Sequence, residues 1–454
     1  MMAYRKQKSK RGVLQRFVKR TVAGKRARGL IRRTEFKTHA ELEEMQFRML
    51  RRIVEYSWNN IQGYRELWEA TNFHPSKLKS LSDYHLIPII EKNDIRGELL
   101  LFSNSKVQDK VLRYTGGSTG NPFSFYTDVQ DSASTNEFIH DVWRCRYKKL
   151  PSSPIRTSLR GDKIKGLFEF RPKHGLVLST YQLTEKNVDQ YVKLIDDYGK
   201  TGLLHAYPSS AYLLARLMEQ QRLKLRERFK LIALGSEKLY PFQLDMIKRH
   251  LGDNITHWYG MAEGVCLAGY CKHIDKFHIY PQLCIAEVLD ENDNPVEKGE
   301  VGEVVGTNFW NYVTPLIRYR SGDRAVLGDN KCDECGRNYQ LLDSIEGRTQ
   351  ECFYDTDLQP VICTGYYFLM SRFENVVDSQ YIQDVPGEVG LLIVKSKSYS
   401  QKDEDEIKKA LETMYRGRIK FHVKYVDSLE RSATNKIRFL IQNINREEVK
   451  ARCE

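Results

Sequence analysis

The sequence lacks any apolar run of the roughly 18 residues that a membrane-spanning helix requires. It holds only nine cysteines in 454 residues, an odd number, and no secretory signal precedes them. A scaffold of disulfide bonds is therefore not expected. Together these absences predict a cytosolic protein that is soluble or touches a membrane only at its surface. The cysteines are Cys145, Cys266, Cys271, Cys284, Cys332, Cys335, Cys352, Cys363 and Cys453.

Acidic residues are missing from the first 34 positions, where thirteen of the 72 Lys and Arg residues are found. The other 59 basic residues balance the 59 acidic ones, so the net charge of +13 resides in this segment. Val13, Leu14, Phe17, Val18 and Val22 recur there at helical spacing. This pattern predicts a basic arm, residues 1–34, that lies on an anionic membrane or docks on an acidic partner. A solvated tail is an equal alternative, and nucleic acid, whose phosphates also attract Lys and Arg, is less favoured.

Neither of the two familiar phosphate-binding motifs is present. A Walker loop would end in Gly-Lys-Ser/Thr, where this chain reads Gly-Asn-Pro at 120–122. A dinucleotide fingerprint would run into a helix, whereas Pro122 opens an extended segment. The loop 115–120 instead combines Gly, Ser and Thr, so its backbone N–H groups can converge on phosphate oxygens. Strand-like runs at 110–113 and 122–127 flank it. This placement favours a nucleotide site, with an ordinary surface turn as the alternative.

Helix-like and strand-like segments alternate along the chain, which predicts an α/β fold with a partly parallel sheet. Helices are expected at 38–70, 187–198, 209–229 and 240–250, the third capped by its serines, and strands at 203–207, 231–234 and 255–259. The sequence is β-rich over 282–329. We expect a large domain over 35–348, with mixed sheets flanked by helices and a β-rich subdomain, and a small α+β C-terminal lid domain over 349–454.

Six short motifs follow one another: the loop 115–120, Gly235-Ser236-Glu237, Tyr259-Gly260-Met261-Ala262-Glu263, Arg318-Tyr319-Arg320-Ser321-Gly322-Asp323, Gly347-Arg348 and Lys436. Each motif alone arises readily by chance, but their joint order and spacing are far more specific. They resemble the motif series of adenylate-forming enzymes. The nearest resemblance is to the phenylacetate-CoA ligase group, which includes capsular polysaccharide biosynthesis proteins. It covers residues from about 81 to about 440.

The resemblance implies which residues handle the phosphates. Such enzymes attack the α-phosphate of ATP with a carboxylate, form an acyl-adenylate and release pyrophosphate, so negative charge builds on the phosphates. The β- and γ-phosphates would be held by Thr115, Gly116, Gly117, Ser118, Thr119 and Gly120. The catalytic residues would be Thr119, Glu263, which binds Mg²⁺ near the α-phosphate, and Lys436, which approaches from the mobile C-terminal domain.

The resemblance also implies the nucleoside contacts. Tyr259, with Gly260 beside it, would stack on adenine, and Asp323 would accept hydrogen bonds from both ribose hydroxyls. Arg348 would contact ribose or phosphate beside the hinge. The base would be lined by Gly235, Ser236 and Glu237.

The chain departs from the family's usual pattern at two places. Asn121 stands where the glycine-rich loop often carries Lys, which weakens the attraction for the triphosphate. Thr349-Gln350-Glu351 stands where the hinge usually offers an acidic pair or a Lys, which puts the domain rotation and thioester formation with coenzyme A in doubt.

A metal site is expected from the Cys332-x-x-Cys335 spacing, which lets two thiolates reach one tetrahedral ion. A redox pair or a chance pair is the alternative. Part of the same ligase group carries a zinc in a similar arrangement with Cys-x₆-His, which adds Cys271 and His278, or His273 if His278 faces away. Four ligands would leave no open position, so the zinc would be structural.

The function expected is ATP-dependent activation of a carboxylic acid, followed by transfer of the acyl group to coenzyme A or to an amine or hydroxyl of an envelope-glycan precursor. The alternative is a zinc-containing binding protein that has lost turnover and uses its basic arm on a membrane or nucleic acid. The acid itself is not identified. Four residues could line its pocket: His205, Tyr207, Trp258 and Cys266. Aromatic residues beside buried strands are, however, more often part of the core.

Overall fold

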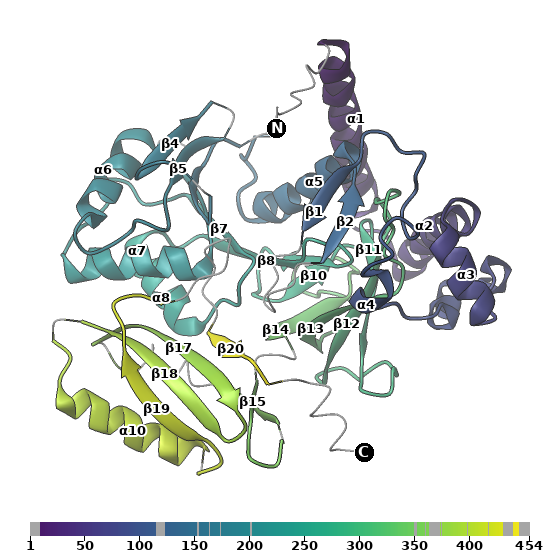
Figure 1. Cartoon of the computed structure of the whole chain (residues 1–454). Coiled ribbons are helices and arrows are strands. Elements are labelled where there is room, and N and C mark those ends of the chain that lie inside the picture. Colours follow the sequence, from purple (N-terminus) through teal and green to yellow (C-terminus); the bar gives the residue numbers. More distant parts are fainter. Residues whose placement is uncertain are drawn as a thin grey trace, which may run out of the picture. The chain divides into compact units, whose positions relative to one another are not determined.

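The computed structural model describes residues 10–114, 123–151, 154–162, 164–172, 174–199, 202–348, 352–358, 360–362, 373, 375–396, 398–415, 417–429 and 439–444. The chain forms two compact units, each assembled from segments that are distant in sequence (Figure 1). Unit 1 comprises Met1–Pro154, Lys230–Ser236 and Asn254–Glu346, and unit 2 comprises Ile155–Phe229, Glu237–Asp253 and Gly347–Glu454. Among the described helices, none is long and apolar enough to cross a membrane.

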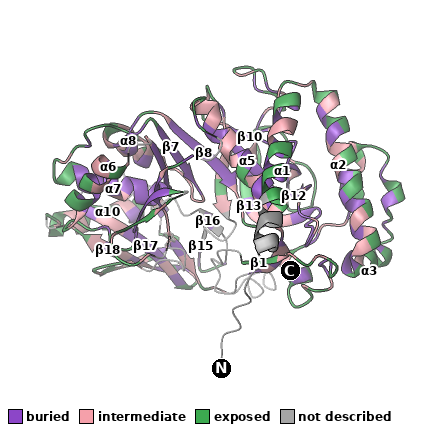
Figure 2. Ribbon diagram, turned by 90° about the horizontal axis from the view of Figure 1, so that it is seen from above, coloured by how far each residue is buried: buried purple, intermediate pink, exposed green. Residues whose placement is uncertain are grey.

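A mixed sheet forms the centre of unit 1. Its strands lie in the spatial order β11, β12, β13, β14, β10, β9, β8 and β7. They span Cys284–Leu289 (β11), Val301–Asn308 (β12), Tyr319–Leu327 (β13), Leu341–Arg348 (β14), Phe277–Ile279 (β10), Leu267–Tyr270 (β9), Ile255–Gly260 (β8) and Leu231–Gly235 (β7). β7 and β8 pair in parallel and are buried along most of their length (Figure 2), whereas β8 and β9 pair antiparallel. The predicted α/β class with a partly parallel sheet is confirmed.

Helices and a hairpin surround this sheet. The elements are η1 (Pro75–Lys77), η2 (Leu81–Leu86), α4 (Lys92–Ile95), β1 (Val111–Tyr114), β2 (Ser124–Thr127) and α5 (Val129–Arg146). β1 and β2 pair antiparallel on either side of residues 115–122, so the strands expected to flank the glycine-rich loop are present. The loop itself lies outside the described residues.

The single helix expected at 38–70 is instead two helices, α2 (His39–Asn60) and α3 (Gln62–Ala70). The prediction was wrong because the chain turns out of the helix at Ile61, which is extended with φ −128° and ψ 111°. The Asn60 side chain donates to the carbonyl four residues earlier at 2.9 Å. Such local bonds compete with continued helix formation.

The basic segment forms helix α1 (Lys10–Thr34). Its C-terminal half packs against α5 (Figures 1 and 2), and Ala23, Ala27 and Ile31 are buried there. Alanines at a spacing of four let two helices approach closely. This half is therefore part of unit 1, and the alternative of a solvated tail is wrong for it. The side chains of Val13, Leu14 and Phe17 lie outside the described residues.

The described strands of unit 2 form two groups of four and a hairpin. The first has the order β6 (Leu203–Ala206), β3 (Thr157–Leu159), β5 (Gly175–Leu178) and β4 (Phe168–Arg171), with helices α6 (Val188–Tyr198), α7 (Pro208–Gln220) and α8 (Pro241–His250). The second has the order β19 (Lys420–Tyr425), β18 (Glu388–Lys395), β17 (Val376–Val385) and β20 (Leu440–Gln442), with helix α10 (Gln401–Tyr415). β15 (Cys352–Tyr354) and β16 (Pro360–Ile362) form a hairpin.

Most of the expected elements are present within one or two residues, but the helix expected at 209–229 ends early, at Gln220. Its serines do not cap it: Tyr207 occupies the N-cap position, Pro208 follows, and the Ser210 hydroxyl donates to the Leu159 carbonyl at 2.7 Å. Proline is suited to the first helical position because the N–H that it lacks would have no intrahelical partner.

The boundary between the units after Glu346 falls at the junction expected near Gly347. Unit 2 also includes 155–229 and 237–253, segments that the sequence placed in the large domain. The division into 1–34, 35–348 and 349–454 therefore remains a prediction.

Candidate active site and metal centre

The parallel strands β7 and β8 carry two of the motifs predicted to bind adenine. Gly235 lies opposite Trp258 in their pairing, near the carboxyl ends where open α/β sheets bind ligands. A Cβ at Gly235 would lie 2.5 Å from the Trp258 ring, so only glycine fits there without a shift. Ser236 follows with a φ of 71°, an uncommon left-handed conformation that often occurs at functional sites.

Tyr259 and Asp323 lie next to each other. The Tyr259 hydroxyl donates to the Asp323 carboxylate at 3.0 Å, although the residues are 64 positions apart. Burial, and then the nearby Asp323 charge, raise the pKa of Tyr259 well above its ordinary value, so the hydroxyl stays protonated and remains a donor. Asp323 is held by a second bond, from its backbone N–H to the Ser321 hydroxyl at 3.1 Å. The structure thus brings together the residues predicted to bind adenine and ribose.

The predicted Mg²⁺ ligand Glu263 is buried in the turn after β8. At the next position, Gly264 has a φ of 70°, and a Cβ there would lie 2.8 Å from the Asn308 amide nitrogen. That nitrogen donates to Asp131 at 3.5 Å. Burial, and to a lesser extent Asp128, raise the pKa of Asp131 to about 7. Asp131 is a carboxyl group near this turn that sequence reasoning missed, because an acid in a first helical turn is normally exposed.

Glu237, predicted to line the base, lies in unit 2. Its carboxylate accepts a hydrogen bond at 3.0 Å from the backbone N–H of Ser209, in the first turn of α7. Unpaired N–H groups and the helix dipole favour negative charge at this position. Glu237 therefore has a structural contact in addition to its predicted role.

Several predicted site residues cannot be placed. The loop 115–120 and Lys436 lie outside the described residues, as do Asn121 and 349–351. Arg348 is the last residue of β14, and its side chain lies outside the described part of the chain. Gly260 is the last residue of β8 and pairs with Leu267. The roles given to these residues remain predictions.

The residues suggested for the acid pocket are all buried. In unit 2, His205 and Tyr207 both contact Arg160. The His205 Nε2 lies 3.2 Å from a guanidinium nitrogen of Arg160, and the guanidinium lies 4.9 Å from the centroid of the Tyr207 ring. In unit 1, Trp258 packs against Trp143 with 5.9 Å between ring centroids. Burial in these contacts is what core residues show, so the structure does not single them out as substrate ligands.

The four residues predicted to bind metal come together in unit 1. One ligand atom from each of Cys271, His278, Cys332 and Cys335 lies within 4.8 Å of the others. Cys271 follows β9, His278 lies on the antiparallel neighbour β10, and both other cysteines lie between β13 and β14. The backbone N–H of His273 donates to the Cys271 sulfur at 3.4 Å, so His273 supports the cluster and His278 provides the imidazole.

The spacing and the residue types of the cluster are compatible with a tetrahedral metal site. Zinc–sulfur bonds of about 2.3 Å place two tetrahedral ligands roughly 3.8 Å apart. The Cys271 and Cys332 sulfurs are 3.8 Å apart, and the Cys335 sulfur lies 3.5 Å from the His278 Nε2. Hydrogen bonds from Cys335, from His278 and from two backbone N–H groups lower the pKa of Cys271, and the same bond to Cys271 raises the pKa of Cys335.

Arg146, at the end of α5, fixes the loop that carries Cys271. Its guanidinium donates to the carbonyl of Cys271 at 2.8 Å, to the carbonyl of Ile255 at 2.7 Å and to the Asp275 carboxylate at 2.7 Å. Ile255 begins β8, the strand that ends at Tyr259 and Gly260. One side chain therefore connects the cysteine–histidine cluster to the strand that carries the motif predicted to bind the nucleotide.

A separate cavity of about 940 Å³ lies in unit 1 beside α2 and η2. Its wall includes Tyr84 and the ion pair between Arg318 and Glu287, which are 3.0 Å apart. None of the described residues predicted to contact the nucleotide lines it. The cavity is thus distinct from the Tyr259–Asp323 site.

Comparisons with known proteins show which proteins this chain resembles. A family model described as the CapK C-terminal domain matches residues 366–443. Protein CapK of Staphylococcus aureus is 23% identical over 418 residues, which cover 89% of this chain and 90% of that protein. Phenylacetate-coenzyme A ligase of Thermus thermophilus is 23% identical over 364 residues, which cover 74% of this chain and 80% of that enzyme.

A solved structure of 2-hydroxyisobutyryl-CoA ligase, in the postadenylation state with R3-HIB-AMP, superposes with a TM-score of 0.69. The two share 18% identity, and the match covers 92% of each chain. At this identity the likeness concerns the fold, which includes the C-terminal domain. The chain is therefore a relative of CapK and of the phenylacetate-coenzyme A ligases, and it has the fold of the adenylate-forming superfamily.

Proposed function

We propose that the protein is an AMP-forming acid–thiol ligase that activates a carboxylic acid with ATP. The single observation that carries this proposal is the contact between Tyr259 and Asp323. It unites two motifs that bind adenine and ribose in the enzymes that the sequence resembles. The names of the relatives, four of them phenylacetate-coenzyme A ligases, support the same reaction class.

The nucleoside is held by the contacts that the geometry of unit 1 favours. The Tyr259 ring stacks on adenine, and its hydroxyl fixes the Asp323 carboxylate, whose two oxygens can accept hydrogen bonds from both ribose hydroxyls. Gly235 leaves room for the Trp258 ring, and Ser236 follows it with a φ of 71° as a further contact proposed for the base. From the motif series alone, we also propose Glu237 and Arg348 as nucleoside contacts.

We assign the phosphates to the loop 115–120, because a Gly-, Ser- and Thr-rich sequence offers backbone N–H groups and hydroxyls as donors to phosphate oxygens. Lys436 brings its positive charge to the α-phosphate and the attacking carboxylate, which lowers the electrostatic cost of bringing two anions together. Mg²⁺ would supply further charge neutralisation, and the buried carboxylate of Glu263 would hold it. The carboxylate oxygen attacks phosphorus, the bond to pyrophosphate breaks, and the acyl-adenylate forms.

The acyl group then passes to coenzyme A, with release of AMP. The names of the phenylacetate-coenzyme A ligases favour this acceptor. An amine or hydroxyl of an envelope-glycan precursor is the second acceptor class, and the relation to CapK over most of the chain favours it. We place the reaction in the cytoplasm, with peripheral contact to the membrane through residues 1–34.

We also propose that Cys271, His278, Cys332 and Cys335 hold a structural zinc ion. The fit of their spacing to a tetrahedral site supports this. With four protein ligands the ion has no open position for substrate, so its contribution is to hold together β9, β10 and the segment between β13 and β14.

The proposal is tested by incubating the full chain with ATP, Mg²⁺ and a panel of carboxylic acids, and by following pyrophosphate release. We expect release that depends on one class of acid and that falls at least about tenfold in Asp323→Ala, because the ribose loses its acceptors. An acyl-sulfamoyl-adenosine analogue should bind the wild type more tightly than the variant. Absence of acid-dependent release across a broad panel, with equal analogue binding by both proteins, would refute the ligase.

A further inference from the structure

Helix α1 has a docked face and a solvent face. Ala23, Ala27, Ile31 and Thr34 are buried and recur at spacings of four, four and three, which places them on one side of a helix. This side contacts α5. At Gly24 the helices approach so closely that a Cβ would lie 3.3 Å from the Glu137 side chain. The docked face therefore determines which side chains of α1 face solvent.

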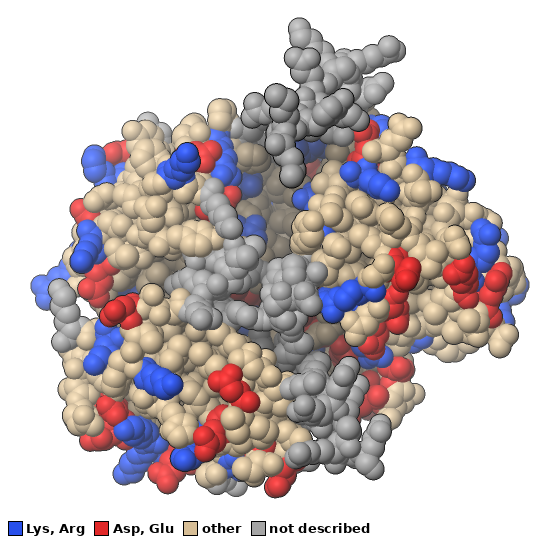
Figure 3. Space-filling model, in the orientation of Figure 1, with Lys and Arg blue, Asp and Glu red and all other residues tan. Residues whose placement is uncertain are grey.

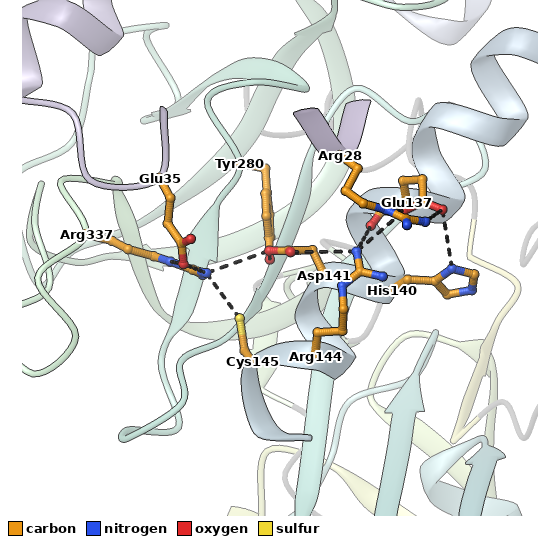
Figure 4. Close-up of polar contacts among 9 residues, drawn as sticks. All are labelled: Arg28, Glu35, Glu137, His140, Asp141, Arg144, Cys145, Tyr280 and Arg337. Atoms are coloured by element: carbon orange, nitrogen blue, oxygen red, sulfur yellow. Dashed lines mark hydrogen bonds and ion pairs between the residues drawn. The ribbon is translucent and has the colours of Figure 1, made fainter. Parts of the chain in front are cut away.

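Ion pairs hold the docked face of α1 against α5 (Figure 4). The Arg28 guanidinium donates to both carboxylate oxygens of Glu137, at 2.8 and 3.0 Å. Arg144 of α5 also contacts Glu137, at 3.4 Å. Just beyond α1, Glu35 pairs with the largely buried Arg337. Bidentate pairs that are partly buried fix orientation better than exposed single contacts do. Helix α1 is thus held in one orientation on unit 1.

The solvent face of α1 combines apolar and basic side chains. Val18 and Val22 are 51% and 59% exposed, although valine usually avoids water. Lys25, Arg32 and Arg33 are exposed on the same side of the helix, which the helical repeat places opposite Ala27. We call these five residues the basic face of α1. Phe36, 64% exposed, follows it in the chain.

Among the described residues of unit 1, no acidic side chain neutralises the charges of the basic face. No described acidic side chain forms an ion pair with Lys25, Arg32 or Arg33, and residues 1–34 contain no acid. Other basic residues of α1 are used differently: Lys19 lies 3.5 Å from Asp109, and Arg26 lies over the Trp310 ring. A charged face without counter-charges attracts a polyanion at low ionic strength.

The exposed basic residues of helix α2, unlike those of the basic face of α1, have acidic partners. Its exposed Arg48 and Arg51 each pair with an acid four positions away, Glu44 and Glu55. The visible surface of the molecule likewise intermixes blue and red side chains (Figure 3). Beyond residue 34 the chain contains 59 basic and 59 acidic residues. The uncompensated charge is therefore a property of α1 and not of the whole surface.

We infer that the basic face of α1 binds an anionic lipid surface while the opposite face stays docked on α5. Lys25, Arg32 and Arg33 meet lipid phosphates, and Val18 and Val22 enter the boundary between headgroups and acyl chains. A nucleic acid would satisfy the charges but would leave both valines and Phe36 in water, so the lipid surface accounts for more of the face. This inference does not depend on the proposed ligase activity.

The test is cosedimentation of the full chain with vesicles of phosphatidylcholine alone or mixed with phosphatidylglycerol. We expect binding only to the mixed vesicles, and loss of binding as salt rises. The triple variant Lys25→Gln, Arg32→Gln, Arg33→Gln should bind about a hundredfold more weakly, because each basic residue near an anionic surface contributes roughly a factor of five. The matched control Arg48→Gln, Arg51→Gln, Arg52→Gln removes the same charge from α2 and should bind as the wild type does.

A second variant separates lipid from nucleic acid. Val22→Ser keeps the charge and should weaken vesicle binding while leaving affinity for a duplex DNA probe unchanged. Thermal unfolding of every variant checks that α1 stays docked. Equal binding to both vesicle types, equal loss in the α2 control, or DNA binding that exceeds vesicle binding in the wild type would each overturn the inference.

Discussion

The hydroxyl of Tyr259 donates a hydrogen bond to the carboxylate of Asp323 at 3.0 Å, between the end of β8 and the middle of β13. Both residues are buried, so the bond is shielded from competition by water. It holds the carboxylate in one orientation before any ligand arrives. A preoriented acceptor costs less entropy when it binds ribose.

Tyr259→Phe should therefore weaken nucleotide binding while preserving the stacking ring. We expect the binding free energy for ATP or an acyl-adenylate analogue, measured by calorimetry, to weaken by about 1–2 kcal/mol. The reason is that Asp323 loses one hydrogen-bond donor and its carboxylate is no longer held in one orientation. The control is Tyr280→Phe, which removes a similar hydroxyl bond of 3.0 Å to the carboxylate of Asp141. That variant should lose stability but keep nucleotide affinity. Equal affinity losses in both would contradict a role for the Tyr259 hydroxyl.

Gly235→Ala should destabilise the protein, because the new methyl group would lie 2.5 Å from the Trp258 ring. Overpacking of this kind costs about 1–3 kcal/mol. Gly260→Ala is the matched change at the end of β8, where the nearest atom would be 3.7 Å away. It should cost less than about 1 kcal/mol, because a contact at that distance needs no repacking. Denaturant unfolding of both variants measures the difference, and similar costs would show that Trp258 can move aside.

Metal removal should destabilise unit 1. We expect about one zinc ion per chain by atomic absorption, and a fall in the unfolding midpoint of about 5 °C after treatment with a strong chelator. Cys335→Ser should lose the zinc and show the same fall without chelator. Cys145→Ser changes a cysteine outside the cluster and should retain the metal. A chain that is purified without metal and is insensitive to chelators would contradict a structural zinc.

Asp131 should make stability depend on pH. Its pKa is raised to about 7 in the folded protein and is about 4 when unfolded, so between these values the unfolded chain binds fewer protons. Stability due to this group is therefore greatest below about pH 4 and falls as the pH rises to about 7. Asp131→Asn should remove this cost and stabilise the protein at pH 8 by about 1–4 kcal/mol, with no gain near pH 4.

The control for this prediction is Asp253→Asn, which changes an aspartate whose side chain is 76% exposed. Its unfolding free energy should follow the wild type across the pH range. A parallel pH profile for Asp131→Asn and the wild type would show that folding does not raise the pKa of Asp131.

Much of the fold could be predicted from the sequence because its signals are local. The strand at 231–234 is a short apolar run, and the helix at 240–250 starts with a proline and ends near a glycine, and both are present. The break at Ile61 was missed because α2 and α3 each continue the helical period. β17 (Val376–Val385) was missed because it alternates polar and apolar residues only in part.

The candidate site was predictable only as a set of motifs. Residue order and spacing predicted Tyr259, Asp323 and the four candidate metal ligands, and the roles given to them remain predictions. The burial of Asp131 and the Arg146 bridge could not be predicted, because each depends on contacts with segments more than 100 positions away.

The sequence by itself determined the alternation of helices and strands, the excess of basic charge in residues 1–34 and the spacing of the cysteine and nucleotide motifs, since all of these are properties of neighbours along the chain. Only the tertiary structure decided that Cys271, His278, Cys332 and Cys335 share one point, that Tyr259 reaches Asp323, and that α1 turns one face to α5 and the other to solvent. The physical reason is that burial and pairing between distant segments depend on the packing of the whole unit, which no local pattern encodes.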